Sequence, residues 1–192
     1  KIAGYRIKSF FTKEPETIEW MNSFGGKKKV LYDIGANIGI YSVYYAKKFN
    51  STVYSFEPQF MNLNLIAKNI QINNINKNVI IMPFPVFNKN KISNFFFGEF
   101  IGGYAAATFS KINVPQIQKY YYKTIGLSLD QLYELNYIKF PNLIKIDVDG
   151  NEEQVIEGLK KIIKKAKKIT ILIENVYKNS SKKIDPKLKT LK

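Results

Sequence analysis

The sequence predicts an α/β protein whose doubly wound, mostly parallel sheet carries helices on both faces. Two observations lead to this fold class. Short apolar runs of strand length alternate with longer segments of helical periodicity along most of the chain. In residues 30–45, VLYDIGANIGIYSVYY, a glycine-bearing turn joins an apolar run to a helix-length apolar segment, as in the opening unit of nucleotide-binding α/β folds.

The first 29 residues are expected to form a cap on this domain. Residues 1–11 alternate weakly between apolar and polar side chains, which predicts an edge strand or hairpin. Thr12 is a candidate N-cap for a following helix, Pro15 suits its first turn, and a glycine pair at 25–26 ends it.

The next elements are a second strand at 52–56, a helix at 60–72 and a third strand from Val79. The third strand is expected to end near Met82, because two prolines follow. Residues 89–110 are less regular and predict a hairpin with a flexible loop over the site.

Three tyrosines at 120–122 precede a short strand at 124–127. They are interpreted as half-buried sheet residues, with stacking on a sugar or base as the alternative. Ser128 is expected to cap a helix that runs through Leu135.

Residues 142–147 predict a buried parallel strand, followed by a helix from Glu152 and a last strand at 169–173. The domain is expected to span residues 30–176. Residues 177–192 form a basic C-terminal segment that is expected to be truncated.

The glycine turn after the first strand predicts a cofactor site. Gly35 and Gly39 stand where a ligand and the helix start must approach the backbone closely. Their spacing differs from the G-x-G-x-x-G of dinucleotide sites, and Asp33 would repel a pyrophosphate. Asp33 suits the ammonium of an amino acid, which favours S-adenosylmethionine (SAM), a nucleoside fused to an amino acid.

Acidic residues also follow two later strands. Glu57 lies about 20 residues after the glycine turn, where a carboxylate can accept hydrogen bonds from both ribose hydroxyls; the alternative is a helix-capping acid before Pro58. Asp147 opens a carboxylate cluster that continues with Asp149 and Glu152. Ligands of open α/β sheets bind beyond the carboxyl ends of the strands, so these acids are expected to share one rim.

Composition excludes several kinds of chemistry. The chain has no cysteine and no histidine, so thiolate metal sites, disulfides and imidazole bases are absent. Its formal net charge is +15, with Arg6 as the one arginine. This charge is interpreted mainly as a solvated lysine surface, with an anionic partner or membrane surface as the alternative. No apolar run is long enough to span a bilayer and no signal peptide is visible, so a cytoplasmic location is expected. The start at Lys1, without methionine, indicates that a preceding segment is missing.

The chain resembles the FkbM-type SAM-dependent methyltransferases. The segments that carry the resemblance are DIGANIGIYS (33–42), FEP (56–58), LSLDQL (127–132) and IKIDVDGNEEQVIEG (144–158). The resemblance implies a Rossmann-like, class I methyltransferase fold, SAM as the cofactor, and a hydroxyl of a sugar, glycan or small metabolite as the acceptor.

The resemblance also implies roles for individual residues. The methionine end of SAM would lie against the turn residues, and Glu57 and Pro58 would lie at the ribose. The implied catalytic residues close to the transferred methyl are Asp147, Asp149 and Glu152. Position 149 is Asp where the family usually has Glu, and the third strand lacks a polar residue for adenine. The implied cofactor-binding residues of the turn are Asp33, Gly35, Ala36, Asn37 and Gly39.

Asp147 is the hypothesised base or orienting group for the acceptor hydroxyl, supported by Asp149 or Glu152. A metal is not predicted. The alternative considered is a metal-dependent reaction in which Asp147, Glu174 and Asn175 supply oxygen ligands. The rival interpretations are a nucleic-acid (RNA) methyltransferase, which the charge favours, a non-catalytic SAM- or carbohydrate-binding module, and an NAD-dependent oxidoreductase, which the glycine spacing disfavours. The sequence leaves the oligomeric state open.

Overall fold

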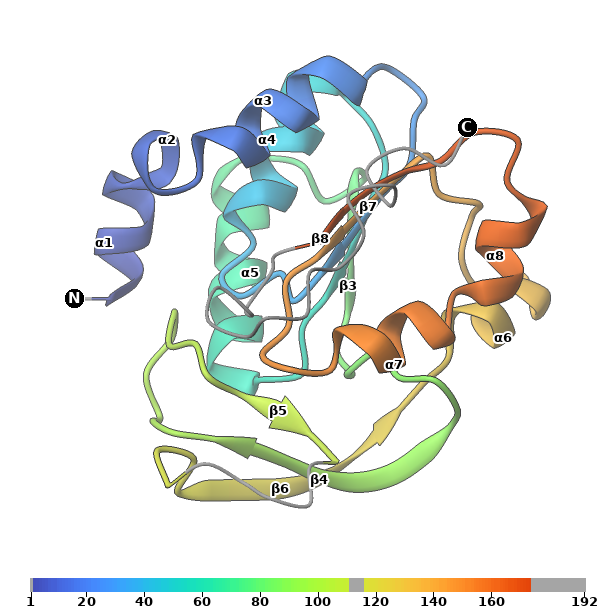
Figure 1. Cartoon of the computed structure of the whole chain (residues 1–192). Helices are drawn as coiled ribbons and strands as arrows, with labels where there is room; N and C mark the ends of the chain where they lie inside the picture. The colour runs from blue at the N-terminus through green and yellow to red at the C-terminus, as the bar shows by residue number, and fades with distance from the viewer. Residues whose placement is uncertain (1, 111–115, 174–192) are drawn as a thin grey trace, which may run out of the picture.

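The structure is a computed structural model that describes residues 2–110 and 116–173. Its central element is a five-stranded sheet with the order β3-β2-β1-β7-β8, in which every neighbouring pair is parallel (Figure 1). This arrangement confirms the predicted fold class. The strands are β1 (Leu31–Ile34), β2 (Val53–Phe56), β3 (Val79–Met82), β7 (Leu143–Ile146) and β8 (Thr170–Ile173).

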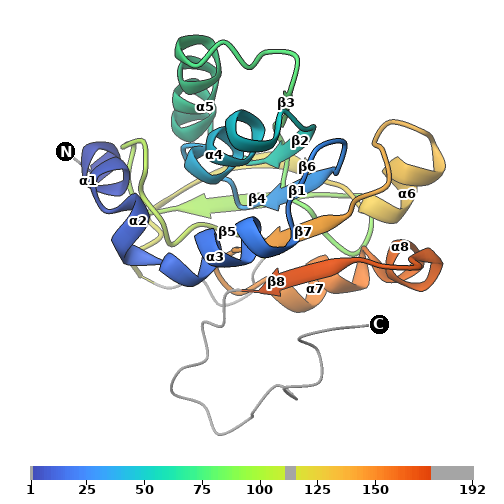
Figure 2. The same cartoon turned by 90° about the horizontal axis from the view of Figure 1, so that it is seen from above.

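Helices cover both faces of this sheet (Figures 1 and 2). One face packs against α3, α4 and α5, and the other against α6, α7 and α8. The helix α5 begins and ends at the predicted positions, and α4 follows the glycine turn as predicted. Their bounds are α3 (Pro15–Phe24), α4 (Ile40–Phe49), α5 (Phe60–Ile72), α6 (Leu129–Glu134), α7 (Glu152–Glu157) and α8 (Lys160–Lys165).

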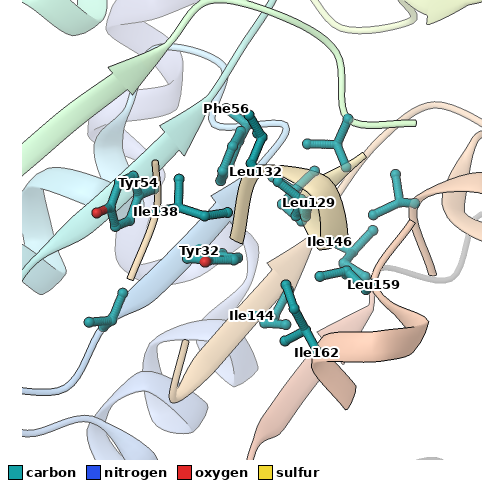
Figure 3. Packing of buried hydrophobic residues seen from close by; sticks show 14 of the residues in the cluster. Tyr32, Tyr54, Phe56, Leu129, Leu132, Ile138, Ile144, Ile146, Leu159 and Ile162 are labelled. Carbon is teal, nitrogen blue, oxygen red and sulfur yellow. The ribbon is translucent and has the colours of Figure 1, made fainter. Parts of the chain in front are cut away.

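Alternation along each strand divides the core between the two faces. Tyr32 and Ile144 point toward α6, α7 and α8, where they pack with Leu129, Leu159 and Ile162 (Figure 3). The neighbouring residues of the strands, such as Leu31 and Leu143, pack against α3 and α4. Because every residue of β1, β2 and β7 is buried, these strands form the rigid centre that positions the site.

A second, antiparallel sheet with the order β5-β4-β6 lies beside the carboxyl ends of the parallel strands (Figure 1). The expected irregular segment 89–110 holds β4 (Lys91–Phe97) and β5 (Thr108–Phe109), which form the hairpin. The tyrosines at 120–122 belong to β6 (Tyr120–Gly126), so the predicted strand starts four residues earlier than expected. Tyr121 is exposed, while the Tyr122 hydroxyl donates a hydrogen bond to the Pro58 carbonyl.

The prediction of an edge strand or hairpin at residues 1–11 is wrong. This stretch forms α1 (Ile2–Lys8) and part of α2 (Phe10–Lys13). The Phe10 ring packs 5.4 Å from the rings of Tyr41 and Tyr44 on α4, a long-range contact that favours the helical conformation over a weak local alternation. Glu14, rather than Thr12, occupies the N-cap position of α3.

The helix expected from Glu152 is divided into α7 and α8 by a turn at Gly158. A Cβ atom at Gly158 would lie 2.2 Å from the Phe87 carbonyl oxygen, so the chain passes this point only without a side chain. Asp130 accepts hydrogen bonds from the backbone N–H groups of Lys161 and Ile162, both at 2.9 Å, and so caps α8 from another element. Ser128 precedes α6 as expected, but its hydroxyl donates to the Gly158 carbonyl.

Within residues 2–110 and 116–173, no helix has the length and apolar character needed to cross a membrane. The predicted basic segment 177–192, and the residues Glu174 and Asn175 considered as metal ligands, lie outside the described residues.

Candidate functional site: a cavity at the carboxyl edge of the parallel sheet

A cavity of about 200 Å³ lies between the carboxyl edge of the parallel sheet and the antiparallel sheet. A smaller cavity adjoins it on the side of α1, α2 and α4, and the two share a wall that includes Gly35 and Asp147. The larger cavity therefore occupies the place where ligands of open α/β sheets bind. The predicted site residues that line it are Gly35, Asn37, Glu57, Pro58, Asp147 and Asp149.

Four predicted residues are placed elsewhere. Ala36 lines only the smaller cavity. Gly39, Asp33 and Glu152 line neither cavity. Of these four residues, Asp33 lies inside β1 and Glu152 inside α7, whereas Ala36 and Gly39 lie in the turn between β1 and α4.

The glycines of the turn are needed because of their neighbours in the protein. Gly35 and Gly39 have φ values of +80° and +77°. A Cβ atom at Gly35 would lie 1.8 Å from the Asp147 carbonyl oxygen, and one at Gly39 would lie 3.2 Å from Ile66. The turn therefore allows close packing of β1 against the end of β7, in addition to any ligand that it contacts.

Glu57 is held in a fixed position at the wall of the larger cavity. It follows β2 directly, is 6% exposed, and accepts hydrogen bonds from the backbone N–H groups of Asn37 and Gln59, both at 2.8 Å. Burial raises the pKa of Glu57 to about 7, although these N–H groups act in the opposite direction. Its carboxylate oxygens keep lone pairs for further hydrogen-bond donors at the cavity.

Asp33 lies inside β1 and is completely buried, so it does not stand at the strand end as expected. It is flanked in register by Ser55 on β2 and Lys145 on β7. The Ser42 hydroxyl donates a hydrogen bond of 2.6 Å to Asp33. Burial raises the pKa of Asp33 and the nearby Lys145 ammonium opposes this effect. The sequence predicted that Asp33 faces the ammonium of a ligand. In the structure, the ammonium near Asp33 is that of Lys145.

Lys145 connects this buried cluster to the cavity. Its ammonium lies 2.6 Å from Asp147 Oδ2 and 5.0 Å from the centre of the Tyr41 ring. Burial alone would lower the pKa of Lys145, but the carboxylates of Asp147 and Asp33 outweigh it and raise the pKa. Sequence analysis did not select Lys145, although a lysine in the apolar strand run NLIKID was a usable signal.

The three acids expected at the reacting centre have different surroundings. Asp147 lines both cavities and is oriented by Lys145. Asp149 lines the larger cavity and accepts a hydrogen bond of 3.0 Å from the Ala107 backbone; desolvation of its carboxyl by neighbouring atoms raises its pKa. Glu152 accepts a hydrogen bond from the Gly150 backbone at the start of α7.

The N-terminal helices add two cations that sequence analysis did not assign to the site. Arg6 on α1 and Lys13 on α2 line both cavities. The Arg6 Nε atom donates a hydrogen bond of 2.6 Å to the Gly103 carbonyl, which joins α1 to the loop over the cavity. The signal in the sequence was that Arg6 is the one arginine of the chain.

The far end of the larger cavity is mostly apolar. It begins at the segment after β3, where the sequence left the contacts of adenine open, and continues onto the antiparallel sheet. This end can hold a flat, apolar ring system. Its lining includes Phe84, Pro85, Val86, Phe95 and Phe109.

Among the described residues, no group of three or more acidic side chains is arranged to hold a metal ion. Of the three metal ligands considered from the sequence, the structure describes only Asp147, and its Oδ2 atom forms an ion pair with Lys145.

Comparison with known proteins identifies the family. A family model described as "Methyltransferase FkbM domain" matches residues 33–188. The chain belongs to the FkbM methyltransferase family. The match spans the glycine turn, Glu57 and the acidic cluster after β7, and it excludes α1 and α2. Members of this family are SAM-dependent methyltransferases, so membership implies use of SAM.

The solved structure of one methyltransferase shows the same Rossmann-like, class I methyltransferase fold. Precorrin-6Y C5,15-methyltransferase from Geobacter metallireducens is 14% identical over 84% of this chain and 62% of that chain, with a TM-score of 0.50. The C-terminal domain of the enzyme of that name from Rhodobacter capsulatus is 14% identical over 78% and 56%, with a TM-score of 0.47. Precorrin 8W decarboxylase from Methanobacterium thermoautotrophicum is 17% identical over 83% and 61%, with a TM-score of 0.47.

The FkbM chain therefore spans less than two thirds of the length of these three proteins. No curated protein sequence matches it significantly.

Proposed function

We propose that this FkbM protein transfers the methyl group of SAM to a hydroxyl oxygen of a sugar, glycan or other small metabolite. The observation that carries the proposal is Glu57, a buried carboxylate fixed by two backbone N–H groups at the cavity wall. A carboxylate in this place can accept hydrogen bonds from the two neighbouring hydroxyls of a ribose.

The residues on either side of Glu57 fit the remaining parts of SAM. The adenine would lie at the apolar end, near Phe84 and Phe109. The amino-acid part would lie toward Gly35 and the smaller cavity, where Arg6 and Lys13 can face its carboxylate. Ligand pockets usually have about 300–1,000 Å³, so the cavity of about 200 Å³ must widen to hold the whole molecule. The Arg6 hydrogen bond to the Gly103 carbonyl is a contact in this wall that such widening would change.

The side chains near the proposed methyl position favour Asp149 as the proton acceptor. SAM, when bound, supplies an electrophilic sulfonium methyl carbon. The acceptor hydroxyl passes its proton to Asp149 while its oxygen forms the new bond to that carbon and the C–S bond breaks, which leaves S-adenosylhomocysteine. A raised pKa makes a carboxylate a better base. Asp147, held by Lys145, orients the acceptor. Glu152 supports the turn at Gly150.

A second candidate function is RNA methylation, which the net charge of +15 favours. The small cavity and the single arginine favour a small acceptor instead.

A methyl-transfer assay separates the candidates. The protein is incubated with SAM labelled in the methyl group and with pools of oligosaccharides, small hydroxylated metabolites or total RNA, and the formation of S-adenosylhomocysteine is measured. The proposal predicts label in an alkali-stable methyl ether of a carbohydrate or metabolite. Label confined to RNA would support the second candidate. Binding of SAM without transfer to any pool would support a non-catalytic binding module.

A further inference from the structure

An apolar groove lies outside the candidate site, where the N-terminal helices meet α4 and α5. It has a volume of about 330 Å³. Figure 2 shows α1 and α2 at one side of the molecule, next to α4 and α5. We call this feature the N-terminal groove. It is lined by Ile7, Phe10, Phe11, Ile40, Val43, Tyr44, Asn69 and Asn73.

Large apolar side chains project into solvent around the N-terminal groove. Ile7 is 57% exposed and Phe11 is 66% exposed, although both line the groove. Single exposed apolar residues are ordinary, but two large ones on the wall of an apolar groove indicate a surface for binding.

Every charged residue of the four helices that frame the groove is a lysine or an arginine. No Asp or Glu occurs in α1, α2, α4 or α5. Glu14 follows α2 directly and contacts Tyr41 and Lys13, with 15% of its side chain exposed. The exposed acids Glu16 and Glu19 lie on the next helix, α3. The charged residues of these helices are Arg6, Lys8, Lys13, Lys47, Lys48 and Lys68.

We propose that this face binds the surface of an anionic lipid bilayer. Exposed Ile7 and Phe11 would enter the boundary between headgroups and acyl chains, and the groove would accept part of an acyl chain. The exposed lysines Lys47 and Lys48 would meet the lipid phosphates. The combination of an apolar groove with four framing helices that carry basic and no acidic residues is complementary to such a bilayer.

Two other kinds of partner fit the surface less well. RNA would require stacking platforms and arginine contacts, and the groove offers branched aliphatic side chains and no arginine in its lining. A second copy of this chain would bring two basic faces together, which is unfavourable. The proposal does not depend on methyl transfer, because none of the groove residues lines the candidate site except Phe10 and Ile40, which reach the smaller cavity.

Co-sedimentation with vesicles tests the proposal. The wild-type protein is mixed with vesicles of phosphatidylcholine alone and with vesicles that also contain phosphatidylglycerol, and the bound fraction is measured. The apolar variant is Ile7→Ser/Phe11→Ser. Its matched control is Ile92→Ser/Ile125→Ser, a pair of exposed isoleucines that are neighbours across β4 and β6. The charge variant is Lys47→Gln/Lys48→Gln, and its control is the exposed pair Lys167→Gln/Lys168→Gln.

The proposal predicts binding to the anionic vesicles and little to the neutral ones. A lysine near an anionic surface contributes about fivefold in partitioning, so the charge variant should bind roughly 25-fold more weakly. The apolar variant should also lose binding, while both controls should keep it. Unfolding curves and S-adenosylhomocysteine binding of the variants establish that they remain folded.

Several results would overturn the proposal. Absence of wild-type binding would do so directly. An equal loss in the Lys167/Lys168 control would indicate general charge attraction, and unchanged binding of the apolar variant would exclude the groove. Self-association that the apolar variant abolishes, seen by sedimentation velocity without vesicle binding, would assign the face to a second copy of the chain.

Discussion

Lys145 Nζ lies 2.6 Å from Asp147 Oδ2, and the Lys145 residue is the cross-strand neighbour of Asp33 in the core of the parallel sheet. The buried ammonium of Lys145 thus forms an ion pair with Asp147 at the cavity wall and also lies close enough to the completely buried Asp33 to affect its pKa. Buried charges are stable only when they are paired. Lys145 therefore links the stability of the sheet to the position of Asp147.

Replacement of Lys145 by Met should destabilise the protein, because it leaves Asp33 buried without its cationic neighbour. The expected loss in the free energy of unfolding is about 3–5 kcal/mol, measured by urea denaturation. Lys139→Met, at an exposed position, is the control. The double variant Lys145→Met/Asp33→Asn should recover part of the loss, and a Lys145→Met protein as stable as the wild type would refute the pairing.

The affinity for S-adenosylhomocysteine should fall as the pH is lowered through about 7. Burial raises the pKa of Glu57 to about 7, and the ionised carboxylate is the better acceptor for ribose hydroxyls. Below this pH the dissociation constant should rise by up to about tenfold per pH unit. Calorimetry across the pH range measures it. Glu57→Gln should bind weakly at every pH, and a pH-independent wild-type affinity would contradict the assignment.

The contribution of Glu57 to stability should change with pH in the opposite direction to the affinity for S-adenosylhomocysteine. The folded protein binds the Glu57 proton more tightly than the unfolded chain, because its pKa is raised from 4.5 to about 7. The contribution of Glu57 to the free energy of unfolding is therefore fully present below about pH 4.5 and is lost as the pH rises through about 7. Denaturation curves of the wild type and Glu57→Gln should show a difference that changes across this window, and a constant difference would count against it.

Arg6→Ala should weaken binding of S-adenosylhomocysteine but leave binding of 5′-methylthioadenosine, which has no carboxylate, unchanged. A hydrogen bond to a charged group contributes about 1.5–3 kcal/mol, so the loss should be on the order of tenfold or more. Lys8→Ala, on the same helix but outside both cavities, is the control. If both ligands lose affinity equally, Arg6 acts through the structure of α1 and its contact with Gly103 rather than through the carboxylate.

Asp149→Asn should lower the rate of methyl transfer by about 10²–10⁴-fold while S-adenosylhomocysteine still binds, because it removes the proposed base. Asp147→Asn should also lower turnover, through loss of orientation. Glu152→Gln should change the rate little, because Glu152 contacts the Gly150 backbone and lines neither cavity. Single-turnover rates with an identified acceptor provide the comparison, and full activity in Asp149→Asn would assign the base to another group.

The sequence allows prediction of the elements whose cause is local. The helix at 60–72 follows from its periodicity, and the end of β3 at Met82 follows from the prolines after it. The features that sequence analysis missed depend on distant residues. The N-terminal helices are supported by Phe10 against α4, and the break at Gly158 depends on Phe87 and Asp130. Because such contacts join residues far apart in the chain, local patterns do not reveal them.

The displacement of Asp33 from the predicted rim has the same kind of cause. Asp33 lies one residue before the end of β1, a strand whose residues are all buried, and its carboxylate accepts a hydrogen bond from Ser42 on α4. The nearby ammonium of Lys145 on β7, more than 100 residues away in the sequence, opposes the effect of this burial on the pKa of Asp33.

Calorimetric titration of Glu57→Ala with S-adenosylhomocysteine tests the central claim most directly. The wild type and the exposed-site control Glu153→Ala should bind it with an affinity on the order of micromolar, and neither should bind NAD. Glu57→Ala should bind far more weakly, while its unfolding curve shows that it remains folded. Unchanged binding in Glu57→Ala, or preferential binding of NAD by the wild type, would contradict the account.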